Sequence, residues 1–151
     1  MDYRLIDASP EDEAWLDGLR RRAYEDLFEA TWGGWDEARH SRQFSESMRR
    51  GHISIIEIGG RRVGMIQLLA HTDAVEVAEI QIDPSHQDRG VGTRVLLDVI
   101  SDASARGRDV RLSVALTNRK AIKLYERLGF SSVEQSETHC HMRYPAASRP
   151  S

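Results

Sequence analysis

The chain has 151 residues, of which 30% are charged and 40% are apolar, and its formal net charge is −3 at pH 7. This balance is typical of a soluble, single-domain globular protein and argues against a general nucleic-acid binder. No apolar run approaches the roughly 20 residues that span a bilayer, and a lone cysteine, Cys140, excludes a disulfide framework. We therefore expect one cytoplasmic domain over residues 1–145, a monomer or homodimer, followed by a flexible tail over residues 146–151.

Two helices are expected in the first third of the chain. Ser9 and Pro10 suit a helix N-cap and first helical position, and this helix is expected to run to about Phe28. Its apolar residues repeat at helical spacing and should face the core: Trp15, Leu19, Ala23 and Leu27. A second helix should follow from about Asp36 to Arg50.

Strands are expected at residues 3–6, at 53–58 and 63–69 around a tight Gly59–Gly60 turn, and at 75–82. In the last of these, Val75 and Val77 share one face whereas Ile80 and Ile82 share the other. A β-bulge near Ala78–Glu79 would bring both pairs to one face, and a strand covered on both faces would also explain the pattern.

The segment Gln87-Asp88-Arg89-Gly90-Val91-Gly92-Thr93 joins this strand to a helix expected over residues 93–106. Its two glycines allow a tight turn and let a ligand approach the main chain. The first N–H groups of a helix have no internal partner and lie at its positive end, which predicts a pocket for a phosphate or pyrophosphate.

Two glycine-loop classes fit this segment poorly. A P-loop requires Lys followed by Ser or Thr after the second glycine, where the chain has Thr93 and Arg94. A dinucleotide-binding turn requires a third glycine, which would fall at Val95.

The remaining pattern, Gln/Arg-x-x-Gly-x-Gly/Ala after a strand, resembles the acetyl-CoA loop of the GNAT N-acetyltransferase superfamily. A second match follows a strand in which the apolar residues Val110, Leu112 and Val114 alternate: Asn118, Ala121, Leu124-Tyr125 and Leu128-Gly129-Phe130. The resemblance implies an α/β fold, with a mixed, mainly antiparallel sheet of six or seven strands, a splayed central parallel pair and helices on both faces. It also implies acetyl-CoA as acetyl donor and direct attack of a primary amine on the thioester.

The resemblance places the cofactor largely on main-chain groups. The expected contacts are the loop residues Gln87, Asp88, Arg89, Gly90, Val91, Gly92 and Thr93, with Arg94 adding charge. The strand end, at Ile80, Gln81 and Ile82, would pair with the pantetheine arm like an added strand. Asn118 would hydrogen-bond the same arm, although it equally suits a helix N-cap.

Two residues are the candidates for proton transfer. Tyr125 lies where the family often has a general acid for the departing thiolate, and its alternative role is core packing. Glu79 is the first candidate for the base that helps deprotonate the amine, followed by Glu76 or water, and either carboxylate could instead be an ion-pair partner.

The acceptor and other functions stay open at this stage. Trp32, Trp35 and Asp36 could line a pocket for a cationic amine or form a satellite core. The acceptor could be a small molecule or a peptide, and His139-Cys140-His141 lacks the further ligands that a zinc site needs. A non-catalytic acyl-CoA sensor, or an interaction domain that uses the fold without the cofactor, is the alternative to an enzyme.

Overall fold

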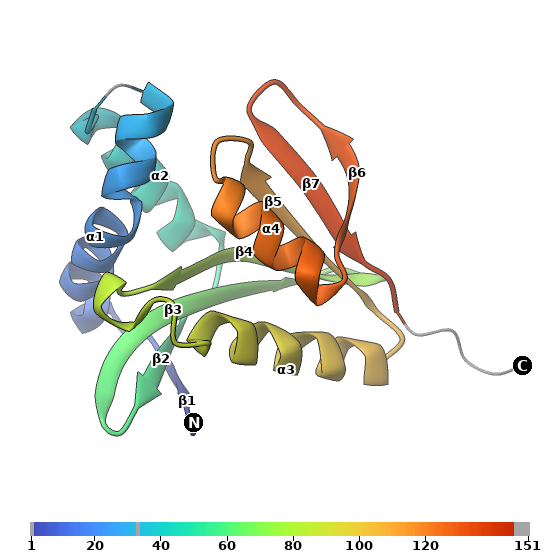
Figure 1. Ribbon diagram of the computed structural model, residues 1–151. Coiled ribbons are helices and arrows are strands. Elements are labelled where there is room, and N and C mark those ends of the chain that lie inside the picture. Colours follow the sequence, from blue (N-terminus) through green and yellow to red (C-terminus); the bar gives the residue numbers. More distant parts are fainter. Residues whose placement is uncertain (1, 33, 147–151) are drawn as a thin grey trace, which may run out of the picture. The chain divides into compact units, whose positions relative to one another are not determined.

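The computed structural model describes residues 2–32 and 34–146, without the side chains of residues 26–28 and 30–32. Its elements are β1 (Arg4–Asp7), η1 (Pro10–Asp12), α1 (Glu13–Trp32), α2 (Glu37–Arg50), β2 (Ser54–Ile58), β3 (Arg61–Ala70), β4 (Ala74–Ile82), η2 (Pro84–His86), α3 (Val91–Ala105), β5 (Asp109–Ala115), α4 (Arg119–Leu128), β6 (Ser131–Gln135) and β7 (His139–Tyr144) (Figure 1). The strands form a seven-stranded sheet in the order β1-β2-β3-β4-β5-β7-β6. β4 and β5 are parallel, and the pairs β1–β2, β2–β3, β5–β7 and β6–β7 are antiparallel, which confirms the predicted fold class.

The chain divides into two compact units, and β4 contributes to both. The first unit holds the described residues up to Leu68 together with Glu79–Gly92. The second holds Leu69–Ala78 and the described residues from Thr93 onward. Among the helices of the described ranges, none is both long and apolar enough to cross a bilayer.

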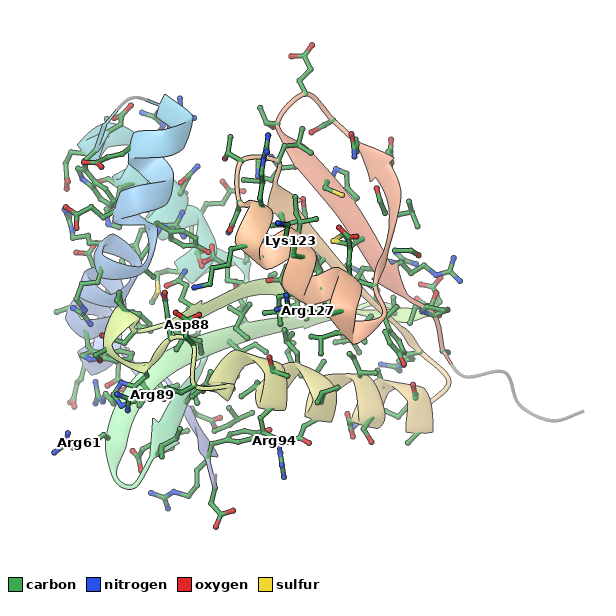
Figure 2. All side chains as sticks on the ribbon, viewed as in Figure 1. Arg61, Asp88, Arg89, Arg94, Lys123 and Arg127 are labelled. Carbon is green, nitrogen blue, oxygen red and sulfur yellow. The ribbon has the colours of Figure 1, made fainter. Side chains whose placement is uncertain are left out.

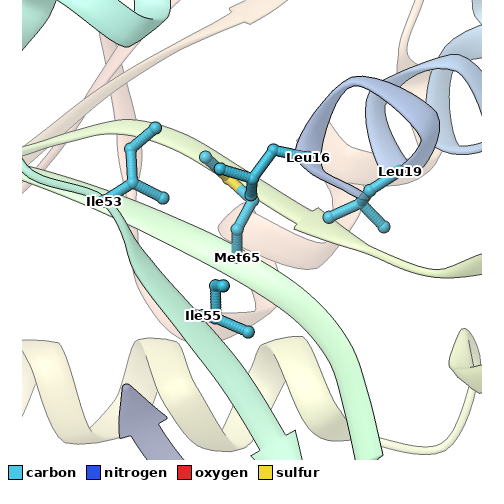
Figure 3. Close-up of a cluster of buried hydrophobic side chains, with 5 residues drawn as sticks. All are labelled: Leu16, Leu19, Ile53, Ile55 and Met65. Carbon is cyan, nitrogen blue, oxygen red and sulfur yellow. The ribbon is translucent and has the colours of Figure 1, made fainter. Parts of the chain in front are cut away.

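In the first unit, helices α1 and α2 pack on β2 and β3. Ser9 is the N-cap before η1, as predicted, and its N–H donates to Asp12 Oδ2 at 2.8 Å. The buried cluster of this unit takes its side chains from α1, β3 and the β2 region: Leu16, Leu19, Ile53, Ile55 and Met65 (Figure 3). Phe44 and Met48 of α2 pack against the same cluster.

The buried face of α1 differs from the predicted one. Leu16 and Leu19 are buried, whereas Trp15 is half-buried and lies beneath the guanidinium of Arg62, 5.5 Å from its ring centroid. Arg20 is buried on this helix as well. The prediction for Leu19 is therefore confirmed, and the half-buried Trp15 packs against the same cluster. Ala23 is half-buried and the Leu27 side chain lies outside the described residues.

The second unit contains the parallel pair and the C-terminal hairpin. Pairing between β4 and β5 runs from Ala74–Asp109 to Val77–Leu112, and β5 continues beside β7 as far as Ala115–His139. The described parallel pairing thus covers the first part of β4, as expected for a splayed pair, and the bulge near Ala78–Glu79 stays a prediction. Along β5, alternate residues are buried, as predicted: Val110, Leu112 and Val114.

Gly64 on β3 allows a close approach to the end of β4. A Cβ at this position would collide with the main-chain oxygen of Gln81 and lie 3.0 Å from Ile82 Cδ1. The backbone at Gln81 cannot move away freely. Asp83, two residues after Gln81, donates its N–H to the oxygen of Val63, the residue before Gly64, at 2.8 Å. The absence of a side chain at Gly64 is therefore a packing requirement.

We expect Gly64→Ala to destabilise the protein by about 1–3 kcal/mol, the usual cost of forcing extra volume into a packed site. Urea unfolding of the variant and the wild type measures this difference. Gly59→Ala is not a suitable control, because φ at Gly59 is 57° and alanine is strained there. Val63→Ala, which removes volume instead, separates overpacking from general sensitivity of β3. Unchanged stability of Gly64→Ala would contradict the close approach.

Candidate active site

The loop before α3 has the backbone conformation of an anion-binding turn. Asp88 has φ 62° and Gly90 has φ 80°, so two nearby residues adopt the left-handed region. Where residues alternate between left-handed and right-handed backbone conformations, successive N–H groups point to one side of the chain and create a concave site for anions. The sequence predicted this conformation for Gly90 but missed it at Asp88, although Asp is among the residues that tolerate it.

Helix α3 begins at Val91, two residues earlier than predicted. Gly92 and Thr93 therefore belong to its first turn, where N–H groups have no partner within the helix. The prediction treated Gly92 as part of the turn, but a glycine in the first turn costs a helix less than one in its interior.

Gly92 has no side chain although the protein's own packing does not require this. Its φ is not in the left-handed region, and a Cβ would lie 3.7 Å from Ile82 Cγ1, an ordinary contact distance. Alanine would suit a helix better by up to about 1 kcal/mol. The missing side chain is therefore best explained by a ligand that approaches the main chain.

Two arginines carry positive charge near this loop. Arg89 precedes Gly90, and Arg94 lies just after the first turn of α3 (Figure 2). Arg94 Nε lies 3.7 Å from Asp98 Oδ2, and both side chains are exposed. Exposed charges of this kind attract an anion without fixing it, so the main chain carries the geometry of the site.

The end of β4 offers fewer free main-chain groups than the sequence suggested. Ile82 O accepts a hydrogen bond from Gln87 Nε2 at 3.0 Å, which ties the start of the loop to the strand. A carbonyl has two lone pairs, so Ile82 O can accept one further bond. Gln81 is buried, whereas Ile80 and Ile82 are half-buried.

Glu79 lies in a network of polar side chains within the first unit. Arg20 Nη1 donates to Glu79 Oε1 at 3.2 Å and to Oε2 at 3.0 Å. Gln81 Nε2 also donates to Oε2, and Arg20 Nη2 donates to Gln43 Oε1 at 2.8 Å. Local sequence patterns do not mark Arg20 or Gln43, since Arg20 meets Glu79 59 positions away and Gln43 meets Arg20 23 positions away.

Glu76, the second candidate base, has a different environment in the second unit. His71 Nε2 lies 2.9 Å from Glu76 Oε1, and the His71 side chain is 46% exposed. His71 is exposed and Glu76 is half-buried, and the pair lies at the turn into β4, since His71 N–H donates to Ala74 O at 2.9 Å. The contact gives Glu76 a structural role in that turn.

Asn118 and Tyr125 lie on α4 as predicted. Asn118 is the N-cap, and its Oδ1 accepts from Ala121 N–H at 3.3 Å, so the Asx-x-x-Ala spacing forms a cap. The cap uses only the Asn118 oxygen, so the side-chain amide nitrogen of Asn118 can donate to another group. The Tyr125 ring packs edge-on against Phe130 at 5.8 Å, and Phe130 packs edge-on against Tyr144 at 5.7 Å. This aromatic series fixes the orientation of Tyr125.

Burial raises the pKa of Tyr125 to about 12. Within the described residues, the hydroxyl makes no hydrogen bond to another side chain, so the shift has desolvation as its cause. The hydroxyl is therefore protonated at neutral pH and can act as a donor.

The predicted acceptor region contains its own network. Trp35 Nε1 donates to Glu37 Oε2 at 2.9 Å, the Arg21 guanidinium lies 5.7 Å from the Trp35 ring centroid, and the His40 ring centroid lies 5.0 Å away. Hydrogen bonds from Arg21 and then Trp35 lower the pKa of Glu37 to about 2. An internal cation thus lies over the ring that was expected to face a cationic amine.

Asp36 is the N-cap of α2, and its Oδ1 accepts from Arg39 N–H at 3.0 Å. Helix capping accounts for a carboxylate at this position. The Trp32 side chain lies outside the described residues, so its predicted role is untested. Trp35 contacts Glu37 and Arg21, and Asp36 caps α2, so both residues have structural roles.

Comparison with known proteins gives consistent matches. The acetyltransferase (GNAT) family profile matches residues 19–130. A mycothiol acetyltransferase of Thermomonospora curvata is 32% identical over 131 residues, which is 85% of this chain and 43% of that protein. The N-alpha-acetyltransferase RimI of Mycobacterium tuberculosis is 34% identical over 103 residues, which is 66% of this chain and 63% of RimI. The chain spans less than half the length of the mycothiol acetyltransferases that it matches.

Solved structures share the fold at low sequence identity. The PaiA N-acetyltransferase of Thermoplasma acidophilum, in complex with coenzyme A, has a TM-score of 0.77 at 17% identity and covers 96% of this chain and 99% of its own. The ribosomal-protein-S18-alanine N-acetyltransferase of Escherichia coli has a TM-score of 0.70 at 19% identity, and the match covers 99% of this chain and 97% of that protein's chain.

We expect burial of Tyr125 to make stability depend on alkaline pH. Its pKa is about 12 in the native protein and about 10 when unfolded, so the contribution is complete below pH 10 and is lost as pH rises toward 12. The full loss is on the order of 3 kcal/mol, with about 1 kcal/mol lost by pH 11. Urea unfolding at pH 9 and pH 11 should show a smaller fall for Tyr125→Phe than for the wild type. Equal falls would show that the hydroxyl is not desolvated.

Proposed function

Because the chain belongs to the acetyltransferase (GNAT) family, we propose that it transfers the acetyl group of acetyl-CoA directly to a primary amine. The amine nitrogen forms a bond to the thioester carbonyl carbon, and the carbon–sulfur bond breaks. CoA leaves as a thiolate that takes up a proton, and the amine loses one. The observation that carries this proposal is the loop before α3, with left-handed Asp88 and Gly90 and an unfilled Cβ position at Gly92.

The loop fits the pyrophosphate of the cofactor. Left-handed residues orient main-chain N–H groups, and the first turn of α3 adds N–H groups at the positive end of a helix. We assign the pyrophosphate to residues 87–93, and the pantetheine arm to residues 80–82 and the amide of Asn118. When bound, acetyl-CoA supplies the activated acetyl group.

Tyr125 is the proposed donor to the departing thiolate. A CoA thiol resembles a thiol of pKa about 8.5, whereas the pKa of Tyr125 is about 12 in the protein without cofactor. Complete proton transfer would be uphill by roughly 5 kcal/mol at these values. Tyr125 therefore acts mainly as a hydrogen-bond donor that stabilises the developing negative charge on sulfur.

Glu79 is the proposed base for the amine, directly or through water. Lysine-like amines have pKa about 10.4 and α-amines about 7.7–8.0, so either class needs to lose a proton before attack at neutral pH. The contact of Glu79 with the buried Arg20 supports this role, and the pairing of Glu76 with the exposed His71 makes Glu76 the weaker candidate.

The acceptor is a small-molecule or peptide amine, with Trp32, Trp35 and Asp36 proposed to border its site. Relatives are named for mycothiol acetylation and for protein N-alpha-acetylation, so both thiol-bearing amines and peptide N-termini belong in an acceptor screen. We propose a cytoplasmic location, which the single cysteine supports.

Acetyl-CoA should raise the melting temperature, because a ligand that binds the native state alone stabilises it by about 2.7 kcal/mol at a hundredfold excess over Kd. Gly92→Glu should abolish the rise, because it places bulk and negative charge against the pyrophosphate. Gly92→Ala should retain part of it and controls for the loss of the glycine itself. An equal rise in Gly92→Glu would refute the assignment of the loop.

Tyr125→Phe keeps the ring packing and removes the hydroxyl. We expect kcat to fall at least tens-fold, in line with the ~10²–10³-fold effect of removing one hydrogen-bond donor to a developing negative charge, while acetyl-CoA affinity stays near the wild-type value. Release of free CoA thiol, measured with a thiol reagent, gives both the rate and the distinction from a non-catalytic sensor. An unchanged kcat would leave protonation of the thiolate to water and assign Tyr125 to the core.

A further inference from the structure

Arg20 is a buried cation that joins three elements of the first unit. Its side chain on α1 is 9% exposed, and its two terminal nitrogens donate to Glu79 on β4 and to Gln43 on α2. The guanidinium carbon also lies 4.9 Å from the ring centroid of Tyr24, one turn further along α1. The planar fork of arginine allows these contacts to be made at once, which a lysine ammonium could not reproduce in the same geometry.

Stability alone is a weak explanation for this arrangement. Burying two charges costs free energy that their attraction often does not recover, and apolar side chains of similar size are often as stable or better. Arg20 Nε is buried and has no hydrogen-bond partner within the described residues, which adds to the cost. It lies beside a small cavity lined by Ser47, Met48 and Gln81 among others. A costly polar group at Glu79 therefore calls for a functional reason.

The hydrogen bonds to Glu79 leave one position open. An ionised carboxylate has about four lone-pair sites. Arg20 donates to both oxygens and Gln81 donates to Oε2, which accounts for three of them. The Glu79 side chain is 15% exposed, so the remaining site is the one that an amine proton or a bridging water can reach.

We propose that Arg20 is the positioning residue for Glu79. It fixes the carboxylate so that a single lone pair is directed to the acceptor, and Gln43 fixes the guanidinium against α2. Arg20 itself exchanges no proton: the amine proton passes to Glu79 directly or through one water. This inference rests on the proposed function, in which Glu79 is the base.

A double-mutant cycle tests this role. The enzymes are the wild type, Arg20→Met, Glu79→Gln and the double variant, with kcat, amine KM, acetyl-CoA affinity and pH profile measured for each. If Arg20 acts through Glu79, Arg20→Met should lower kcat at least tenfold in the wild-type background and less than twofold in the Glu79→Gln background, because interacting residues are not additive. Acetyl-CoA affinity should be unchanged, and the acidic limb of kcat/KM should shift in Arg20→Met.

Arg20→Lys keeps the charge and should recover part of the kcat lost in Arg20→Met. If Arg20→Met fails to fold, Gln43→Leu and Arg20→Lys in both backgrounds replace it in the cycle. Arg4→Met is the matched control, because it breaks an Arg–Glu pair with Glu57 at 2.5 Å on the exposed edge of the same unit. It should leave kcat and the pH profile unchanged.

The outcomes distinguish failure of the positioning role, failure of Glu79 as the base, and failure of the proposed function. The same fold-loss from Arg20→Met in both backgrounds would overturn the positioning role and make Arg20 a structural residue. Wild-type kcat in Glu79→Gln would overturn Glu79 as the base, and with it this inference, while acetyl transfer by the protein stands. Absence of thiol release from the wild type with every acceptor, despite acetyl-CoA binding, would overturn the proposed function itself.

Discussion

The ion pair between Arg20 and Glu79 is the constraint on which the packing of α1 in the first unit depends. A guanidinium within the buried stripe of α1 requires an anion at the facing position of β4 and a polar partner on α2, and the chain supplies Glu79 and Gln43. This requirement explains why α1 presents Leu16 and Leu19 to the cluster and leaves Trp15 at its edge. The face of the helix is set by the charge that must be satisfied as well as by apolar area.

The proposed cofactor site follows a different principle, because main-chain groups are proposed to form it. Left-handed φ angles at Asp88 and Gly90 and the first turn of α3 orient N–H groups whatever side chains surround them. Side chains around the loop stabilise its conformation. Gln87 Nε2 donates to Ile82 O, and Asp83 Oδ1 accepts from Ser85 N–H at 3.1 Å. A binding site made of backbone tolerates wide sequence variation outside its glycines.

The sequence could predict features that depend on neighbouring residues, but not contacts between residues far apart in the chain. Gly90, the Asn118 cap and the position of Tyr125 on α4 follow from short patterns, since each depends on residues within a few positions along the chain. Arg20, Gln43 and Gly64 could not be found in this way. Gly64 is required by a carbonyl of β4, 17 residues away, and Arg20 pairs with a residue 59 positions away. Contacts of this kind leave no periodic or compositional signal in a single sequence.

In the region proposed to border the acceptor, Trp35 and Asp36 have contacts within the protein itself. Two tryptophans and a carboxylate suggested an aromatic wall for a cation, yet Arg21 lies over the Trp35 ring and Asp36 caps α2. An external cation would compete with Arg21, whose guanidinium already donates hydrogen bonds to Asp17 and Glu37. Displacing that arginine would cost those bonds, whereas a neutral amine would leave them intact. The network at Trp35 thus gives Arg21, and not an incoming amine, the cationic contact with this ring.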